Sequence, residues 1–296
     1  MNMAKGARLV TAIGFSPSGK WIAATDAAEK IEVHLFERGK GGKAKFTCEV
    51  GKKCVNLSWM AGDDVMFGVA GAKHLSFFAV DFGKKSAKKT TCKLTGSTNI
   101  SSISWCKSSK YKGHWVAGGS DGKCYYGEKE SGSKAIKLGK SVQSVCSAEA
   151  KFGEIVLVGT NEKAINAYKY SGKLDDKPLW TLDTADKPLS LDLFNETILM
   201  GLKNGSLLTM PMAEKAGEAN LIMTSHCDGE VWGLQVVDIG KGELRAITSA
   251  DDNRILTYDV KKHKALAEGT IKEKSKYKEP KGYRGGASSM SSKKAD

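Results

Sequence analysis

A histidine, a serine and an aspartate lie close together near the C-terminal end of the sequence and could do chemistry if they met in space. They are His226, Ser249 and Asp252, and Tyr258 follows them. The residue types match a hydrolase triad, in which a carboxylate orients a histidine that deprotonates a serine. No Gly-x-Ser-x-Gly turn, which would expose such a nucleophile, accompanies Ser249.

The alternative for these four residues is a structural tetrad of hydrogen bonds. In it, the turn carboxylate of Asp252 holds the imidazole of His226, which binds the hydroxyl of Ser249, which in turn meets Tyr258. A buried network of this kind rigidifies a sheet when all its members are satisfied. We therefore predict a structural tetrad and no catalytic residue.

The other reactive residue types show no spacing of a metal or phosphate site. Glycine-rich runs at 39–43 and 118–122 lack the pattern G-x-x-x-x-G-K-[ST] and precede no expected helix. We expect both runs to be hairpin turns, and the Asp-Gly and Asn-Gly pairs of the chain predict turns of type I′. The seven cysteines form no Cys-x-x-Cys pair, which is typical of buried reduced thiols in a cytosolic protein. The remaining histidines fall in separate parts of the chain and are expected to be ordinary strand or surface residues: His34, His74, His114 and His263. We expect no metal, no cofactor and no enzyme.

The elements that must position these residues are short strands in a repeated order. In each unit, an alternating apolar strand is followed by turns rich in Gly, Asn or Asp and by further strands. Units begin near residues 8, 54, 100, 142, 187 and 229, so successive starts lie 42 to 46 residues apart. One four-stranded sheet cannot bury both its faces, and stacking such units radially covers them. The sequence therefore predicts an all-β fold, a WD40-type β-propeller of about six recognisable four-stranded blades over residues 1–271.

Ring closure and the tail leave alternatives open. A closed propeller has about four to eight blades, so six close the ring alone or with a further blade from another chain. Residues 272–296 are a basic tail rich in Lys, Gly and Ser, with the composition of an extended or disordered segment. This tail is either solvated or lies as a basic arm along an acidic partner.

The net charge of +13 over 296 residues favours an acidic partner without identifying it. No run interleaves aromatic and basic residues, so nucleic acid is not the expected partner. No stretch approaches the roughly 18 apolar residues of a membrane span, and no apolar segment marks a secretory signal, so we expect no membrane association. Lysine-rich loops and the tail supply the candidate contact residues: Lys84, Lys85, Lys88, Lys89, Lys274, Lys276 and Lys278.

Three motifs resemble one family of propellers. Residues 226–234 (H-C-D-G-E-V-W-G-L) are similar to the blade opening G-H-x-D-E-[LV]-W-G-L of echinoderm microtubule-associated protein-like (EMAP-like) proteins. Residues 250–259 (A-D-D-N-R-I-L-T-Y-D) are similar to the blade ending A-x-D-R-x-x-x-x-W-[DN] of that family, and residues 6–16 resemble the start of an earlier blade. The resemblance covers most of residues 6–271 and implies an atypical WD40 propeller.

The resemblance also implies a function. It predicts a non-catalytic, microtubule-associated protein of the cytoplasm and cytoskeleton, which binds tubulin or other axonemal and WD-repeat proteins in the cilium or flagellum. The hydrophobic HELP-type motif and the coiled coil of that family are lacking, so we expect a shortened relative or one part of a larger assembly. The alternative is a general WD40 scaffold of a cytosolic protein complex, not linked to microtubules. In both cases the partners are proteins and there is no small-molecule substrate.

Overall fold

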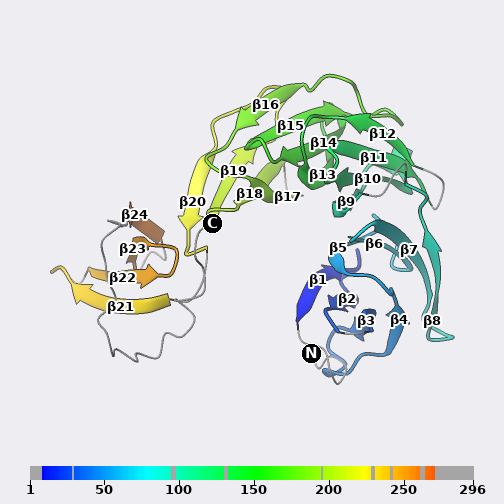
Figure 1. Cartoon of the computed structure of the whole chain (residues 1–296), viewed down its shortest axis with the longest axis horizontal. Helices are drawn as coiled ribbons and strands as arrows, with labels where there is room; N and C mark the ends of the chain where they lie inside the picture. The colour runs from blue at the N-terminus through cyan, green and yellow to red at the C-terminus, as the bar shows by residue number, and fades with distance from the viewer. Residues whose placement is uncertain are drawn as a thin grey trace, which may run out of the picture. The chain divides into compact units, whose positions relative to one another are not determined.

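The chain folds into six antiparallel sheets, each of four strands that pair in chain order (Figure 1). The computed structural model describes residues 9–28, 30–94, 98–129, 133–194, 196–227, 231–240, 243–260 and 264–270. The predicted all-β fold with six four-stranded, WD40-like blades is confirmed, and we name the sheets blade 1 to blade 6 in chain order. Each blade is a separate sheet, and closure of a ring is not seen among the described residues.

Two compact units make up the chain, residues 1–227 and 228–296, and the first contains blades 1 to 5. Blades 1 and 2 consist of β1 (Val10–Phe15), β2 (Trp21–Asp26), β3 (Glu32–Glu37), β4 (Phe46–Glu49), β5 (Cys54–Trp59), β6 (Met66–Gly71), β7 (His74–Asp81) and β8 (Ser86–Thr91). Blade 3 consists of β9 (Ile100–Trp105), β10 (His114–Gly119), β11 (Lys123–Glu128) and β12 (Lys134–Lys137), with the 3-10 turn η1 (Ser109–Tyr111) after β9. Blades 4 and 5 consist of β13 (Val142–Ala150), β14 (Gly153–Thr160), β15 (Ala164–Lys169), β16 (Trp180–Asp183), β17 (Pro188–Phe194), β18 (Thr197–Leu202), β19 (Ser206–Pro211) and β20 (Asn220–Thr224).

The first strands of neighbouring blades hold the first unit together. β1 contacts β5, β5 contacts β9, β9 contacts β13 and β13 contacts β17. Within this unit the first strands run along the inner side and the fourth strands along the outer side (Figure 1). Apolar side chains fill the space between neighbouring sheets, for example Phe67 and Val69 between blades 1 and 2, which have no exposed area. Full burial of such a side chain contributes about 1.5–3 kcal/mol, so each blade is stabilised mainly by its neighbours.

The second unit contains blade 6. Its strands are β21 (Val231–Asp238), β22 (Leu244–Ala250), β23 (Arg254–Asp259) and β24 (Lys264–Thr270). The pairing of β21 with β22 shifts register between Val231 and Gly233. The first strands of the other five blades show the same irregularity near their start. Such a bulge bends and twists the strand that carries it. Its presence at the same position in all six first strands shows that the blades repeat one structural unit.

The predicted hairpin turns are present, but their type differs from the prediction. In the turn after β10, Gly122 has a φ of 78° and its N–H donates to the carbonyl of Gly119. Asn204-Gly205 repeats this arrangement, with only the glycine at positive φ. A type I′ turn requires positive φ at both central residues. These hairpins therefore use a three-residue loop, in which the glycine takes the left-handed position after a turn of ordinary hand.

Candidate functional site

The four residues of the predicted tetrad are divided between the two units. His226 follows β20 in the first unit. Ser249 on β22, Asp252 in the turn after β22, and Tyr258 on β23 all belong to blade 6 in the second unit. The tetrad that includes His226 therefore remains a prediction, and only the part within blade 6 can be described.

Within blade 6 the strand register separates two of the predicted partners. Ser249 pairs with Ile255, and Tyr258 pairs with Ala246. Since side chains alternate between faces along a strand, Ser249 and Tyr258 project from opposite faces of the sheet. The hydroxyl that hydrogen-bonds to Tyr258 is that of Thr248, one residue earlier. The prediction named Ser249 and not its neighbour Thr248. Adjacent residues of a strand project from opposite faces of the sheet, so a difference of one position changes which hydroxyl can reach Tyr258.

Asp252 fixes the turn between β22 and β23. Its Oδ1 accepts the backbone N–H of Arg254 at 3.1 Å, and its Oδ2 lies 3.8 Å from the Nη1 of Arg254. Both side chains are more than nine-tenths buried. Asn253 between them has a φ of 59°, the left-handed conformation that asparagine tolerates. Burial raises the pKa of Tyr258, although the nearby Arg254 charge opposes this. This geometry holds a turn in place.

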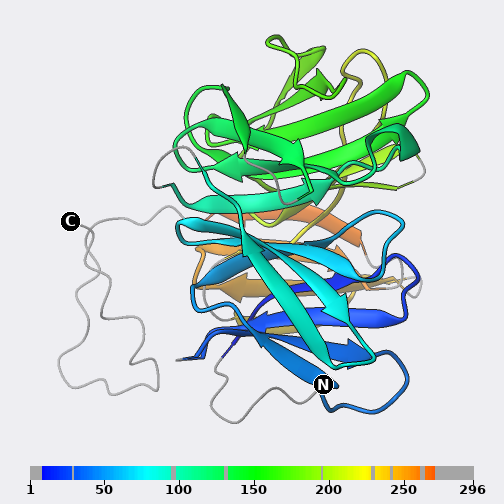
Figure 2. The same ribbon diagram turned by 90° about the vertical axis from the view of Figure 1, so that its right-hand side faces the viewer.

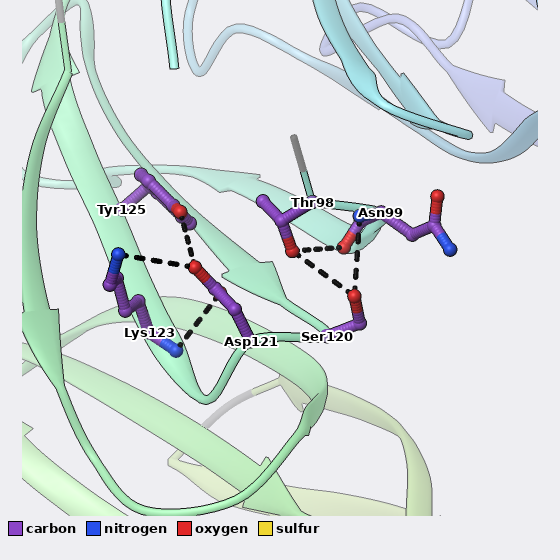
Figure 3. A network of polar contacts seen from close by, with 6 residues as sticks. All are labelled: Thr98, Asn99, Ser120, Asp121, Lys123 and Tyr125. Carbon is purple, nitrogen blue, oxygen red and sulfur yellow. Dashed lines mark hydrogen bonds and ion pairs between the residues drawn. The ribbon is translucent and has the colours of Figure 1, made fainter. Parts of the chain in front are cut away.

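Blade 3 contains a polar network at the corresponding hairpin (Figure 3). The hydroxyl of Tyr125 donates to Asp121 Oδ2 at 2.7 Å, and Thr98 Oγ1 lies 3.1 Å from Ser120 Oγ. Burial alone raises the pKa of Asp121, but hydrogen bonds from Tyr125 and Lys123 outweigh it and hold the pKa below its usual value. The sequence identified residues 120–123 only as a turn. A tyrosine four residues after the turn aspartate was the signal that would have found the network.

Blade 1 contains a buried histidine–carboxylate pair. The Nε2 of His34 lies 2.8 Å from Oδ2 of Asp26, and each side chain is 1% exposed. The second oxygen of Asp26 accepts the backbone N–H of Glu32 at 3.1 Å. His34 was expected to be an ordinary strand residue, but it joins the third strand of blade 1 to the end of the second. Removing one partner of such a pair leaves a buried polar group unsatisfied, which is costly.

Polar and indole groups of the first strands tie neighbouring blades together. Trp59 Nε1 donates to the carbonyl of Gly14 at 3.0 Å, and Trp105 Nε1 donates to that of Ser58 at 3.0 Å. Asn56 Oδ1 accepts the N–H of Ile103 at 3.0 Å. Further serine contacts follow the same route in blades 3 to 5, through Ser101, Ser102, Ser104 and Ser144. The hydroxyl groups of these serines form hydrogen bonds between neighbouring blades, so their role is structural.

Six of the seven cysteines are buried, as predicted, whereas Cys227 is exposed. No disulfide bond joins them in the described part of the chain. Burial raises the pKa of Cys48 to about 11 and the pKa of Cys54, Cys106 and Cys146 to about 12. A thiol needs a lowered pKa to act as a nucleophile, so these side chains are core residues. Over the described ranges, no group of three His, Cys, Asp or Glu side chains is placed to hold a metal ion.

The predicted basic contact residues divide into two sets. Lys84 and Lys85 form the turn between β7 and β8, and Lys88 and Lys89 lie on β8, the hairpin that faces the viewer in Figure 2. The tail lysines lie outside the described residues: Lys274, Lys276 and Lys278.

Of the four hairpin lysines, one has an internal role. Lys89 Nζ donates to the carbonyl of Val50 at 2.6 Å and so ties blade 2 to blade 1. Lys84 is 83% exposed and lies 3.8 Å from Asp81, a surface pair that contributes little. Lys85 has a φ of 52°, and Lys88 is exposed. Lys84, Lys85 and Lys88 are therefore exposed on the hairpin, and their role as contact residues stays a prediction.

Comparison with known proteins gives one distant relative. The ciliary WD repeat-containing protein ctxp80 of Euplotoides octocarinatus is 28% identical over 297 residues, covering 97% of this chain and 37% of that protein. The chain therefore spans little more than a third of the length of this relative. No protein-family model matches the chain.

The comparison supports a relationship with WD-repeat proteins, in agreement with the six four-stranded sheets. The name of that relative describes it as ciliary and WD-repeat-containing. The finer resemblance to EMAP-like proteins stays a prediction. In the described part of the chain, no helix has the length and hydropathy needed to cross a membrane.

Proposed function

We propose that this chain is a non-catalytic WD-repeat component of the ciliary or flagellar axoneme that associates with microtubules. The observation that carries the proposal is a sequence identity of 28% to a protein whose name describes it as ciliary and WD-repeat-containing. The alignment covers 97% of this chain. The six blade-like sheets agree with a scaffold, because propellers present broad surfaces to other proteins. The link to microtubules rests on charge, and the similarity supports only the scaffold and the cilium.

The charge distribution supports an acidic partner such as the tubulin lattice. The net charge is +13, and the exposed β7–β8 hairpin concentrates positive charge in the run K-K-S-A-K-K at 84–89. No acidic residue interrupts that run. A cluster of one sign attracts an oppositely charged surface and accelerates encounter, an effect that salt screens beyond about 8 Å at physiological ionic strength.

A general scaffold without microtubule binding is the second candidate, because apolar side chains are exposed on blade 5. Phe194 is 69% exposed on β17, as is Leu189 in part, and Leu221 is 55% exposed on β20, next to the exposed Ile222 and Met223. Exposed large apolar side chains are typical of protein–protein contact. This candidate predicts a protein complex that persists after microtubules are depolymerised.

Co-sedimentation with stabilised microtubules tests the proposal. We expect the chain to pellet with microtubules at low salt and to be released as salt is raised, because the contact is electrostatic. The charge-reversal variant Lys84→Glu/Lys88→Glu should pellet several-fold less. The matched variant Lys173→Glu/Lys177→Glu changes the same charge in the exposed loop before β16 and should pellet like the wild type.

One result would count against microtubule binding, and another against the role of the β7–β8 hairpin in it. A chain that stays in the supernatant at low salt does not associate with microtubules on its own. Equal losses in both variants would show that only total charge matters and that the β7–β8 hairpin has no special role. Recovery of a defined tubulin-free complex from cells would favour the general scaffold.

A further inference from the structure

A groove at the outer edge of the seam between blades 1 and 2 combines aromatic and basic side chains. It is a cavity of about 350 Å³ formed where the β7–β8 turn meets the start of β2 and β4. From these features we infer that the groove binds an extended acidic peptide segment of a partner protein. One apolar side chain of the peptide would lie on the aromatic floor, and the carboxylates on either side of it would face the lysines. The inference rests on the proposed function, since it names the site at which an acidic partner would bind.

The floor of the groove is a fixed aromatic stack. Trp21 and Phe82 lie with ring centroids 3.8 Å apart and an angle of 11° between their planes, and Phe46 meets Phe82 edge-on at 6.1 Å. Trp21 is 9% exposed and belongs to the core between blades 1 and 2. Phe46 and Phe82 are half-buried and pack against that core. The floor is therefore preformed and offers two aromatic edges to an apolar ligand group.

The rim carries more positive than negative charge. Lys20, Lys45 and Lys85 line the groove together with one acidic residue, Glu37. Glu37 lies 3.3 Å from Lys45 and compensates one of the three charges. Lys20 Nζ lies 5.3 Å from the centre of the Trp21 ring, so its charge is held over the aromatic floor. Two ammonium groups are left to face a ligand.

The segments that flank the groove extend the positive field in two directions. On the blade 1 side, residues 38–45 read R-G-K-G-G-K-A-K, with four basic and no acidic residues. On the blade 2 side, residues 84–89 read K-K-S-A-K-K, again with four basic and no acidic residues. A ligand that matches both flanks must carry several negative charges along an extended chain. An acidic peptide has this charge pattern.

The aromatic geometry favours a peptide over nucleic acid. Single-stranded nucleic acid binds by stacking its bases on exposed aromatic faces. Here Phe82 covers one face of Trp21, Lys20 lies over its ring, and little of the indole is exposed. The rim is also built of lysine, whereas arginine is the residue that binds phosphate in a bidentate manner. The volume is near the lower end of the range for ligand pockets, so it fits about one side chain and not a large cofactor.

The experiment measures binding of a fluorescent glutamate-rich peptide with one phenylalanine to the full chain by fluorescence anisotropy. We expect saturable binding that weakens as salt is raised. Replacing the phenylalanine of the peptide by alanine should weaken binding several-fold, because the apolar contact with the floor is lost.

The variant Lys20→Gln/Lys45→Gln/Lys85→Gln should weaken peptide binding by roughly tenfold, since each exposed ion pair contributes a small factor. The matched variant Lys173→Gln/Lys177→Gln/Lys215→Gln removes the same charge from exposed sites on blades 4 and 5 and should bind like the wild type. Thermal unfolding of both variants shows whether they fold equally well. The three rim substitutions lie at exposed positions, so they should leave the unfolding temperature unchanged.

Three results would overturn the inference: equal affinity of both lysine variants, no gain from the phenylalanine of the peptide, or tighter binding of a single-stranded oligonucleotide than of the peptide. Pelleting assays with the same variants separate the two proposals. If microtubules bind the chain while the peptide does not, the groove is wrong and the proposed function stands. If the peptide binds while microtubules do not, the groove stands and the proposed function is wrong.

Discussion

The indole of Trp105 offers the most direct perturbation of the stacking between blades. Its side chain is 1% exposed, its Nε1 donates to the carbonyl of Ser58 in the preceding blade, and its ring lies 5.4 Å from that of Phe77. Trp105→Phe removes the hydrogen bond and leaves the partly buried carbonyl of Ser58 with one partner fewer, at a cost of about 1–3 kcal/mol. The smaller ring leaves a space of about 40 Å³, which at ~24 cal/mol per Å³ costs about 1 kcal/mol. The expected destabilisation is therefore about 2–4 kcal/mol.

Denaturant unfolding followed by tryptophan fluorescence and by circular dichroism measures this change. For a unit of this size, the loss corresponds to a fall in the unfolding temperature of about 5–15 °C. Phe194→Ala is the control, because Phe194 is 69% exposed and its removal should change stability by less than about 0.5 kcal/mol. If Trp105→Phe unfolds at the same denaturant concentration as the wild type, Trp105 does not join blades 2 and 3 as described.

Further predictions concern a glycine, a tyrosine and the thiols. A Cβ on Gly71 would overlap the carbonyl oxygen of Lys53, so Gly71→Ala should destabilise the chain by about 1–3 kcal/mol in denaturant unfolding. Tyr125→Phe should cost about 1 kcal/mol near pH 7, because it removes a bond to the Asp121 carboxylate. The folded-state pKa of Asp121 is lowered, so this loss should be fully present above about pH 5 and should vanish as the pH falls through that lowered value. A thiol reagent should modify the exposed Cys227 in the native chain and the other cysteines only after unfolding.

Each of these predictions has an internal control. Gly217→Ala places its Cβ at an ordinary 3.7 Å from Met210 and should have little effect, so an equal loss in both glycine variants would contradict the steric explanation. For Tyr125→Phe, a stability difference that persists unchanged at pH 2 would show that Asp121 is not its origin. Rapid modification of several thiols in the native chain would contradict the buried positions of the other six.

The strand order could be predicted from the sequence because each blade repeats a local pattern. Alternating apolar residues and turn residues fix the strands within a few positions, and all six sheets were found where they were expected. Turn type was not predicted correctly at Asp121-Gly122, since the dipeptide does not say whether one or both residues adopt positive φ.

Only part of the candidate site could be predicted from the sequence, because some of its contacts join residues that are far apart in the chain. The charge of Lys84, Lys85 and Lys88 can be read from the sequence, because surface lysines depend little on neighbours. The aromatic stack of Trp21 on Phe82 joins residues of different blades, so no local pattern reports it. In the same way, the internal role of Lys89 depends on a carbonyl group in blade 1. Ser249 and Thr248 differ by one position, and only the observed register decides which faces Tyr258.

Zero-length carbodiimide cross-linking of the chain to microtubules, with the linked residues located by mass spectrometry, tests the central claim most directly. The reaction joins a lysine amine to a carboxylate only where the two are in contact. The account predicts cross-links from Lys84, Lys85 and Lys88 to acidic residues of tubulin, and their loss at high salt. Cross-links confined to other lysines, such as Lys173 and Lys177, or none at all from the pelleted complex, would contradict it.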